Sequence, residues 1–150
     1  MQRNIMKIIK NFIVKNRLSE FPELAGFLAI FGREHQLTDE LVFDITLALE
    51  EIFSNIVFYS YADNNEHRIE IHIGLQDDEI ILEIRDDGTP FNPLEAPKPD
   101  IRRPFSEREP GGLGIFLVHN LMDALDYRTD QGKNILVLKK TARYADLEAS

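Results

Sequence analysis

One stretch of the chain, residues 50–55 (EEIFSN), holds a carboxylate and an amide at helical spacing. Glu51 and Asn55 are four residues apart, so on a helix they stack on one face about one turn apart. Glu51 lies about 60° around the axis from Ala48, at the edge of the apolar stripe, whereas Glu50 faces another side. A carboxylate there needs a partner, such as a divalent cation or a reacting hydroxyl, because an isolated buried charge is costly. An ordinary polar pair at a helix edge is the alternative.

A second group closes a predicted strand with RDDGTPF, residues 85–91. Asp-Gly-x-Pro is common turn chemistry, in which Gly88 supplies permissive backbone torsions. The functional alternative is a base-binding site. There the Asp86 carboxylate accepts a hydrogen bond from an exocyclic amine, and the bare backbone at Gly88 lets a flat ring such as adenine lie close.

Three glycines at positions 111, 112 and 114 directly precede an apolar run of helical spacing. Free N–H groups and the helix dipole make such a start favourable for anions. The stretch is no P-loop, because G-x-x-x-x-G-K-[ST] does not occur, and no dinucleotide fingerprint, because no strand feeds it and the motif is incomplete. A glycine-rich helix start without a ligand remains the alternative.

Three helices are expected to carry these groups. The first spans 19–37 with Ser19 as its N-cap, the second runs from a cap at Thr38 to about Tyr59, and the third begins near Gly112. The apolar stripe of the second helix consists of Leu41, Ile45, Ala48, Ile52, Ile56 and Tyr59.

Alternating apolar residues predict two hairpins. The first pairs 69–75 with 80–84 around QDD, and the second pairs 126–129 with 134–140 around DQGK. Residues 1–15 fit either an amphipathic helix or an edge strand. The order of elements predicts an α+β fold, a two-layer α/β sandwich whose mixed, mostly antiparallel sheet has helices on one face.

Residues 92–110 cannot form a regular helix or a central strand, because five of the seven prolines fall there. The strong patterns on both sides favour one domain over residues 1–150, with a lid or binding loop at about 92–111 hinged at Pro110 and Gly111. Its basic residues are candidates for reaching phosphates: Lys98, Arg102, Arg103 and Arg108.

Composition excludes several classes of protein. The 150 residues, 43% hydrophobic, suit a single core, and the absence of cysteine excludes disulfides, thiolate metal sites and cysteine nucleophiles. The apolar runs are too short to span a bilayer, and a net charge of −9 disfavours nucleic acid and anionic membranes as partners. We expect a cytoplasmic protein.

Taken in order, the E-x-x-x-N helix, the strand ending in D-x-G-x-P-F, the proline-rich loop and the G-x-G helix start resemble the N, G1 and G2 boxes of the Bergerat fold. This ATP-binding fold is shared by gyrase, ninety-kilodalton heat-shock chaperones, histidine kinases and mismatch-repair ATPases. Within it, the chain is most similar to the small bacterial anti-sigma-factor serine kinases, in length and in Pro90-Phe91. The resemblance covers about residues 18–140.

The resemblance implies a role for each matching residue of the long helix. Asn55 would coordinate Mg²⁺, which bridges the nucleotide phosphates, and Glu51 would be the general base for an attacking hydroxyl. These roles suit phosphoryl transfer, which depends mostly on positioning and charge neutralisation.

At the two ends of the nucleotide, the resemblance implies that Asp86 accepts from the adenine amino group and that Gly88 gives the ring room. Gly112 and Gly114 would offer N–H groups to the phosphates.

Two positions depart from the family pattern. Tyr59 stands where a histidine is common, which would mark a different subfamily or regulatory partner. Asn134 stands where a threonine often touches the nucleotide, and it can still hydrogen-bond to it.

The implied function is a Mg-ATP-dependent serine/threonine kinase that phosphorylates a STAS-type anti-anti-sigma protein, sequesters a sigma factor, or does both, as a homodimer. The alternative is an ATP-dependent protein-binding module with little or no kinase activity. Retention of Glu51 favours the kinase, because binding alone needs no base. The catalytic half of a sensor histidine kinase is disfavoured, since none of the four histidines lies in a dimerising helical hairpin.

Overall fold

The computed structural model describes residues 8–95 and 112–146. Five strands and three α-helices follow one another as β1 (Ile8–Lys15), α1 (Phe21–Glu34), α2 (Asp39–Tyr59), β2 (Arg68–Gln76), β3 (Glu79–Asp86), α3 (Gly112–Leu121), β4 (Ala124–Asp130) and β5 (Lys133–Thr141). Two 3-10 turns, Leu18–Glu20 and Pro93–Glu95, complete the described structure. Most of the predicted lid, residues 96–111, lies outside it.

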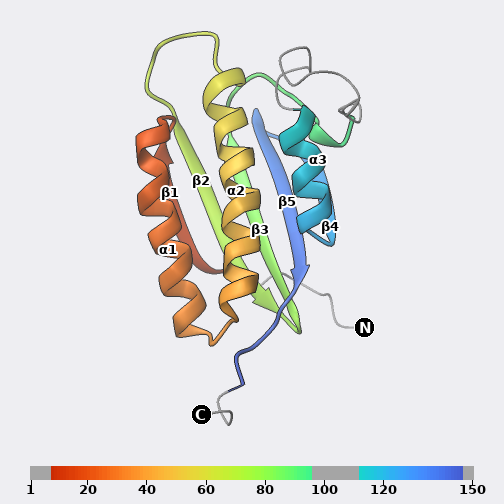
Figure 1. Ribbon diagram of the computed structural model, residues 1–150. Coiled ribbons are helices and arrows are strands. Elements are labelled where there is room, and N and C mark those ends of the chain that lie inside the picture. The colour runs from red at the N-terminus through yellow and green to blue at the C-terminus, as the bar shows by residue number, and fades with distance from the viewer. Residues whose placement is uncertain (1–7, 96–111, 147–150) are drawn as a thin grey trace.

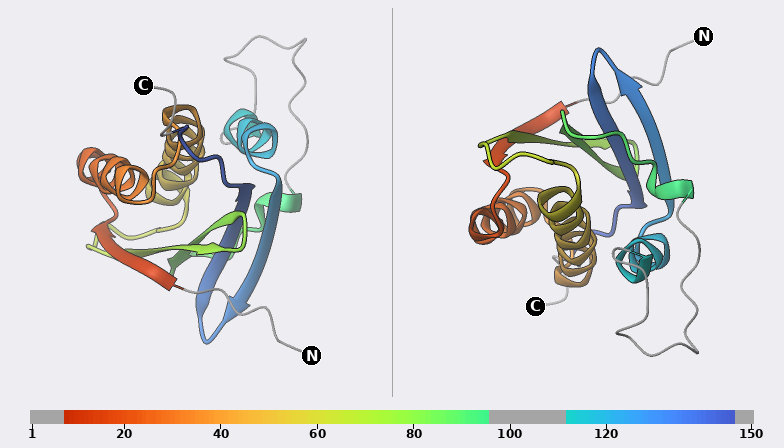
Figure 2. Two further views of the ribbon diagram at one scale, coloured as in Figure 1. Left: turned by 90° about the horizontal axis from the view of Figure 1, so that it is seen from below. Right: turned by 90° about the horizontal axis from the view of Figure 1, so that it is seen from above.

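The strands form one sheet in the order β1-β2-β3-β5-β4, and every pair of neighbours is antiparallel. All three helices cover the same face (Figures 1 and 2). The predicted α+β sandwich with helices on one face is therefore confirmed, although the described sheet is wholly antiparallel rather than mixed. Of the two possibilities for the N-terminal segment, the edge strand is correct, because β1 pairs with β2 from Lys15 opposite Arg68.

The core lies between the sheet and the helices. On β3, the side chains of Ile80, Leu82 and Ile84 face the helices and are almost fully buried. The odd-numbered Ile81 is also buried and packs on the opposite face with Ile135 and Val137 of β5. The central strand β3 is thus buried on both faces over most of its length.

The helix starts follow two different rules. Thr38 caps α2 as predicted, because its hydroxyl accepts a hydrogen bond from the Leu41 N–H at 3.2 Å. The prediction for Ser19 is wrong: Ser19 lies inside a 3-10 turn, and α1 begins at Phe21. Pro22 accounts for this start, since its fixed φ and missing N–H suit the first turn of a helix.

The apolar stripe of α2 is buried as predicted from Leu41 to Ile56. The prediction for the last residue of the stripe is wrong, because Tyr59 is 57% exposed. At this end of α2 the facing surface is an open cavity rather than packed side chains.

Both predicted turns are confirmed. β2 and β3 are joined through Asp77, and β4 and β5 through Gln131 and Gly132, with positive φ at each of these three residues. These two-residue turns set the register of the hairpins.

Candidate functional site

A cavity of about 260 Å³ lies between the end of α2, the start of α3 and the adjoining ends of the sheet strands. Three predicted site residues from three separate elements line it: Asn55 of α2, Asp86 of β3 and Asn134 of β5. Much of the remaining wall is apolar, with Ile52 and Ile84 among its members. Such a surface, with a few converging polar groups, is typical of a small-molecule site.

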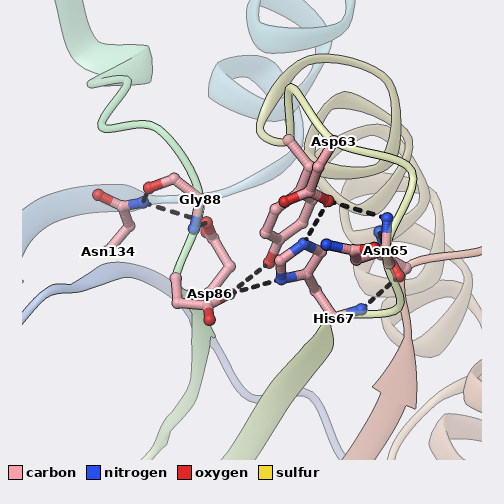
Figure 3. A network of polar contacts seen from close by, with 9 residues as sticks. Asp63, Asn65, His67, Asp86, Gly88 and Asn134 are labelled. Atoms are coloured by element: carbon pink, nitrogen blue, oxygen red, sulfur yellow. Dashed lines mark hydrogen bonds and ion pairs between the residues drawn. The ribbon is translucent and has the colours of Figure 1, made fainter.

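Asp86 is the one carboxylate among the described residues that line the cavity, and only 6% of its surface is exposed. The register places it directly opposite Asn134. Its Oδ1 accepts hydrogen bonds from the Gly88 N–H at 2.9 Å and from Asn134 Nδ2 at 3.1 Å (Figure 3). Burial raises the pKa of Asp86, and these two hydrogen bonds only partly offset the rise.

Gly88 allows the chain after β3 to lie against the end of α2. A Cβ at this position would be 2.5 Å from the Ser60 carbonyl oxygen, which also accepts the Thr89 N–H at 2.7 Å. A side chain would therefore separate the two segments. The next residues, Thr89 and Pro90, form part of the cavity wall.

Asn55 carries an unsatisfied polar atom. Its amide nitrogen is buried and, within residues 8–95 and 112–146, has no hydrogen-bond partner. A buried amide without a partner costs free energy, so it points to a group that a ligand would supply. Because the two ends of an amide exchange by a 180° turn, the same side chain can present its oxygen, an atom type that Mg²⁺ prefers.

Glu51 and Gly114 meet where α2 contacts α3. A Cβ on Gly114 would be only 2.5 Å from Glu51 Oε2, so the carboxylate lies against the first turn of α3, which begins at Gly112. Desolvation, followed by repulsion from Glu50, raises the pKa of Glu51. Glu50 itself is exposed, as the helical spacing predicts.

Tyr127 is a cavity residue that the sequence analysis missed. It lies on β4, and its hydroxyl donates a hydrogen bond to Asn134 Oδ1 at 2.8 Å. The available signal was the period of the strand, because Leu125 and Tyr127 alternate with polar residues and so share the face that covers the core.

A second polar group, which includes Asp87 directly after Asp86, was also missed (Figure 3). The Tyr61 ring stacks on His67 with centroids 3.9 Å apart, and its hydroxyl donates to Asp87 at 3.0 Å. His67 Nε2 lies 2.7 Å from Asp63, which lowers the pKa of that exposed carboxyl. Burial, followed by the charge of Asp86, raises the pKa of Tyr61. No local pattern shows these contacts, since Tyr61 and Asp87 are 26 residues apart.

Two features are absent from the described part of the chain. It contains no group of three or more histidine, cysteine or acidic side chains placed to hold a metal ion. None of its helices combines the length and the apolar character needed to cross a membrane.

Comparison with known proteins gives consistent matches. A family model described as a histidine kinase-like ATPase domain matches residues 14–140. Serine/threonine-protein kinase BtrW from Bordetella bronchiseptica is 34% identical over 117 residues, which cover 73% of this chain and 81% of BtrW. Serine-protein kinase RsbW from Oceanobacillus iheyensis is 33% identical over 109 residues, 69% of this chain and 68% of RsbW. The anti-sigma F factor of the same organism is 26% identical over 70% of this chain and 73% of its own length.

Solved structures share the fold. The structure of RsbU and RsbW domains from Mycobacterium tuberculosis has a TM-score of 0.63 over 91% of this chain and 35% of that longer chain, at 14% identity. A chain of the SiaB-SiaC complex from Pseudomonas aeruginosa has a TM-score of 0.56 over 90% of this chain and 91% of its own, at 15% identity.

Proposed function

This chain belongs to the histidine kinase-like ATPase family, in its branch of bacterial anti-sigma-factor serine/threonine kinases, and from that premise we propose a Mg-ATP-dependent kinase that acts on a STAS-type antagonist protein. The observation that carries the proposal is the convergence of Asn55, Asp86 and Asn134, from α2, β3 and β5, on one cavity. Glu51, also on α2, lies against Gly114 in the first turn of α3.

The nucleotide would lie with its base at Asp86 and its phosphates toward the start of α3. The buried carboxylate of Asp86 supplies an acceptor for the exocyclic amine of adenine. Gly112 and Gly114 lie in the first turn of α3, where backbone N–H groups have no partner within the helix and favour phosphate oxygens.

Asn55 would hold the cation. Its unpartnered amide faces a site where phosphate oxygens would complete the coordination, and Mg²⁺ binds through few protein ligands plus phosphates. When bound, Mg²⁺ would neutralise charge on the phosphates.

Glu51 would be the general base. It takes the proton of the attacking serine or threonine hydroxyl, whose oxygen bonds to the γ-phosphorus while the bond to the ADP oxygen breaks. Desolvation raises the pKa of Glu51, which makes its carboxylate a better proton acceptor than an exposed one.

The protein partners follow from the relatives. One relative is named a serine/threonine-protein kinase, a second a serine-protein kinase, and a third an anti-sigma F factor. We extend this to a STAS-domain substrate and to sequestration of a sigma factor. A homodimer and a cytoplasmic location remain predictions.

The direct test incubates the purified chain with labelled Mg-ATP and the STAS-domain protein encoded nearest to it. We expect phosphoserine or phosphothreonine on that protein. Glu51→Gln should reduce transfer by about 10²- to 10⁴-fold, the range for loss of a general base, and leave nucleotide affinity unchanged. Glu50→Gln is the matched control, because it removes an exposed neighbouring charge whose effect on the pKa of Glu51 is smaller than that of desolvation, so it should reduce transfer far less than Glu51→Gln.

Other outcomes distinguish the alternatives. Binding of ATP without transfer would favour a regulatory module that recognises its partner in the ATP-bound state. An unchanged melting temperature with Mg-ATP would contradict the site itself, because a ligand at one hundred times its Kd stabilises a protein by about 2.7 kcal/mol.

A further inference from the structure

The buried amide of Asn134 has a fixed orientation. Its nitrogen donates to the Gly88 carbonyl oxygen at 3.0 Å and to Asp86 Oδ1 at 3.1 Å. A carbonyl oxygen can only accept, so the NH₂ end must face Gly88 and the oxygen must face away from it. That oxygen accepts the Tyr127 hydroxyl at 2.8 Å. The three side chains of Tyr127, Asn134 and Asp86 therefore form a directed chain of hydrogen bonds.

This chain of bonds fixes Asp86 in turn. The two described donors that reach the carboxylate, the Gly88 N–H and the Asn134 amide, both bond to Oδ1. Oδ2 is thereby left as the acceptor for a ligand in the cavity. Both N–H bonds of the Asn134 amide are used within the protein, so its contribution to a ligand passes through Asp86.

The register of the sheet explains why these residues meet. Asp86 and Asn134 are paired across β3 and β5, and Thr129 of β4 is opposite Asn134. Tyr127 is two residues from Thr129, so it lies on the same face of the sheet. A long aromatic side chain reaches such a diagonal neighbour.

We propose that Tyr127 and Asn134 are positioning residues that make the cavity select a 6-aminopurine nucleotide. This inference rests on the proposed nucleotide site. A carboxylate held with Oδ2 toward the ligand accepts from an exocyclic amine, and it repels a base that carries a carbonyl oxygen at that position. Without the Tyr127 hydroxyl, the Asn134 amide oxygen loses its donor, so the amide that bridges Gly88 and Asp86 Oδ1 is held less firmly in place.

The test compares nucleotide affinities by calorimetry rather than phosphate transfer. Tyr127→Phe keeps the aromatic ring and removes only the hydroxyl. We expect affinity for ATP to fall about three- to tenfold, the cost of one hydrogen bond. Affinity for purine riboside triphosphate, which lacks the amino group, should stay constant, so the preference for ATP shrinks. The affinity for inosine triphosphate should rise relative to the affinity for ATP. Tyr144→Phe, at an exposed tyrosine, is the matched control and should change neither affinity.

A purely structural role gives a different result. Equal losses for ATP and purine riboside triphosphate, or no change in either, would overturn the inference while leaving the nucleotide site in place. An unmodified chain that binds no ATP would overturn the proposed function as well. If Tyr127→Phe does not fold, Asn134→Ser provides the second variant, because a serine hydroxyl has one hydrogen and cannot donate to both Asp86 and the Gly88 carbonyl. An unchanged ratio of the affinities for ATP and purine riboside triphosphate in that variant would also overturn the inference.

Discussion

At the scale of single residues, Asp86 is a buried carboxylate that costs folding free energy and offers an acceptor to a ligand. A buried carboxylate is unfavourable, and burial raises its pKa despite two hydrogen bonds. An apolar or amide residue would fill the position at lower cost. The choice of a carboxylate at this position is explained by an acceptor that the cavity offers to a ligand.

Asp86→Asn tests this account. An amide oxygen can keep the two bonds that Oδ1 accepts, but an NH₂ group would then replace Oδ2 and meet the amine of the base. We expect ATP affinity to fall about ten- to a hundredfold, the range for a hydrogen bond to a charged group, as measured by calorimetry. Unchanged affinity would contradict the assigned base contact.

Asp86→Asn should lower the affinity for ATP but raise the stability of the unliganded chain. Because the pKa of Asp86 is raised in the folded chain, the wild-type carboxyl contributes stability at low pH and loses it as the pH rises through the raised value. The amide that replaces it does not titrate. The unliganded variant should therefore gain in free energy of unfolding relative to wild type at neutral pH, and this gain should vanish below the pKa of an unfolded aspartic acid. Urea denaturation at a series of pH values measures the difference, and a gain that does not change with pH would contradict the assignment.

Gly114→Ala separates binding from chemistry. The added Cβ would lie 2.5 Å from Glu51 Oε2, so the flexible carboxylate must move, while the backbone N–H of residue 114 is kept. We expect slower phosphate transfer with ATP affinity preserved, measured as single-turnover rate against Kd. Gly26→Ala, in α1 with nothing within 4 Å of the new Cβ, is the control and should only stabilise the fold, by about 0.5–1 kcal/mol. Equal transfer rates in both variants would show that the position of Glu51 does not depend on Gly114.

At the scale of elements, α3 is held at its C-terminal end by β5. The Asp123 N–H donates to the Lys139 carbonyl at 2.9 Å, and the Thr141 N–H donates to Asp123 Oδ2 at 2.6 Å. Buried Lys140 donates to the Leu121 carbonyl at the end of α3, and its ammonium lies 3.9 Å from Asp44 of α2. The anchored end leaves the opposite end of α3 against Glu51, next to the cavity.

Lys140→Met tests this anchor. Removal of the ammonium leaves a helix-end carbonyl and Asp44 without their donor, so the free energy of unfolding should fall by about 1–3 kcal/mol in urea denaturation. Lys139→Met is the control, because Lys139 lies on the opposite face of β5. Equal losses in the two variants would show that the anchor contributes nothing specific.

The loop between α2 and β2 is tied to the end of β3 by the group of Tyr61, His67 and Asp87. The phenol and imidazole rings stack, and both reach toward the same Asp87 carboxylate oxygen, at 3.0 and 3.6 Å. Asp87 immediately follows Asp86, so this loop supports the strand end that carries the base contact.

At the scale of the whole molecule, a two-layer sandwich explains why the cavity lies at one end. Between the sheet and the helices the core is filled by large apolar side chains. Beyond the buried part of α2 that filling stops, and the space between Tyr59, Ile115 and Leu136 remains open. The fold thus combines a packed core with a binding site at its edge.

Much of this architecture was predictable from local patterns. The cap at Thr38, both hairpin turns and the buried stripe of α2 from Leu41 to Ile56 depend on neighbours in the sequence, and all were predicted correctly. The prediction that Ser19 caps the first helix was wrong because a nearby proline sets the start of α1 instead. Tyr59 was wrong because spacing places a residue on a face without showing whether anything covers that face.

The sequence by itself determined the elements, their order and the residue types of a nucleotide site, because helical and strand periods and turn chemistry act over a few residues. Only the tertiary structure decided that Asp86 and Asn134, 48 residues apart, share a hydrogen bond, that Glu51 lies against Gly114, and that Tyr127 donates to the amide oxygen of Asn134. The physical reason is that strand register and helix packing set such contacts. Both arise from the whole chain burying its apolar surface at once, and no short segment contains them.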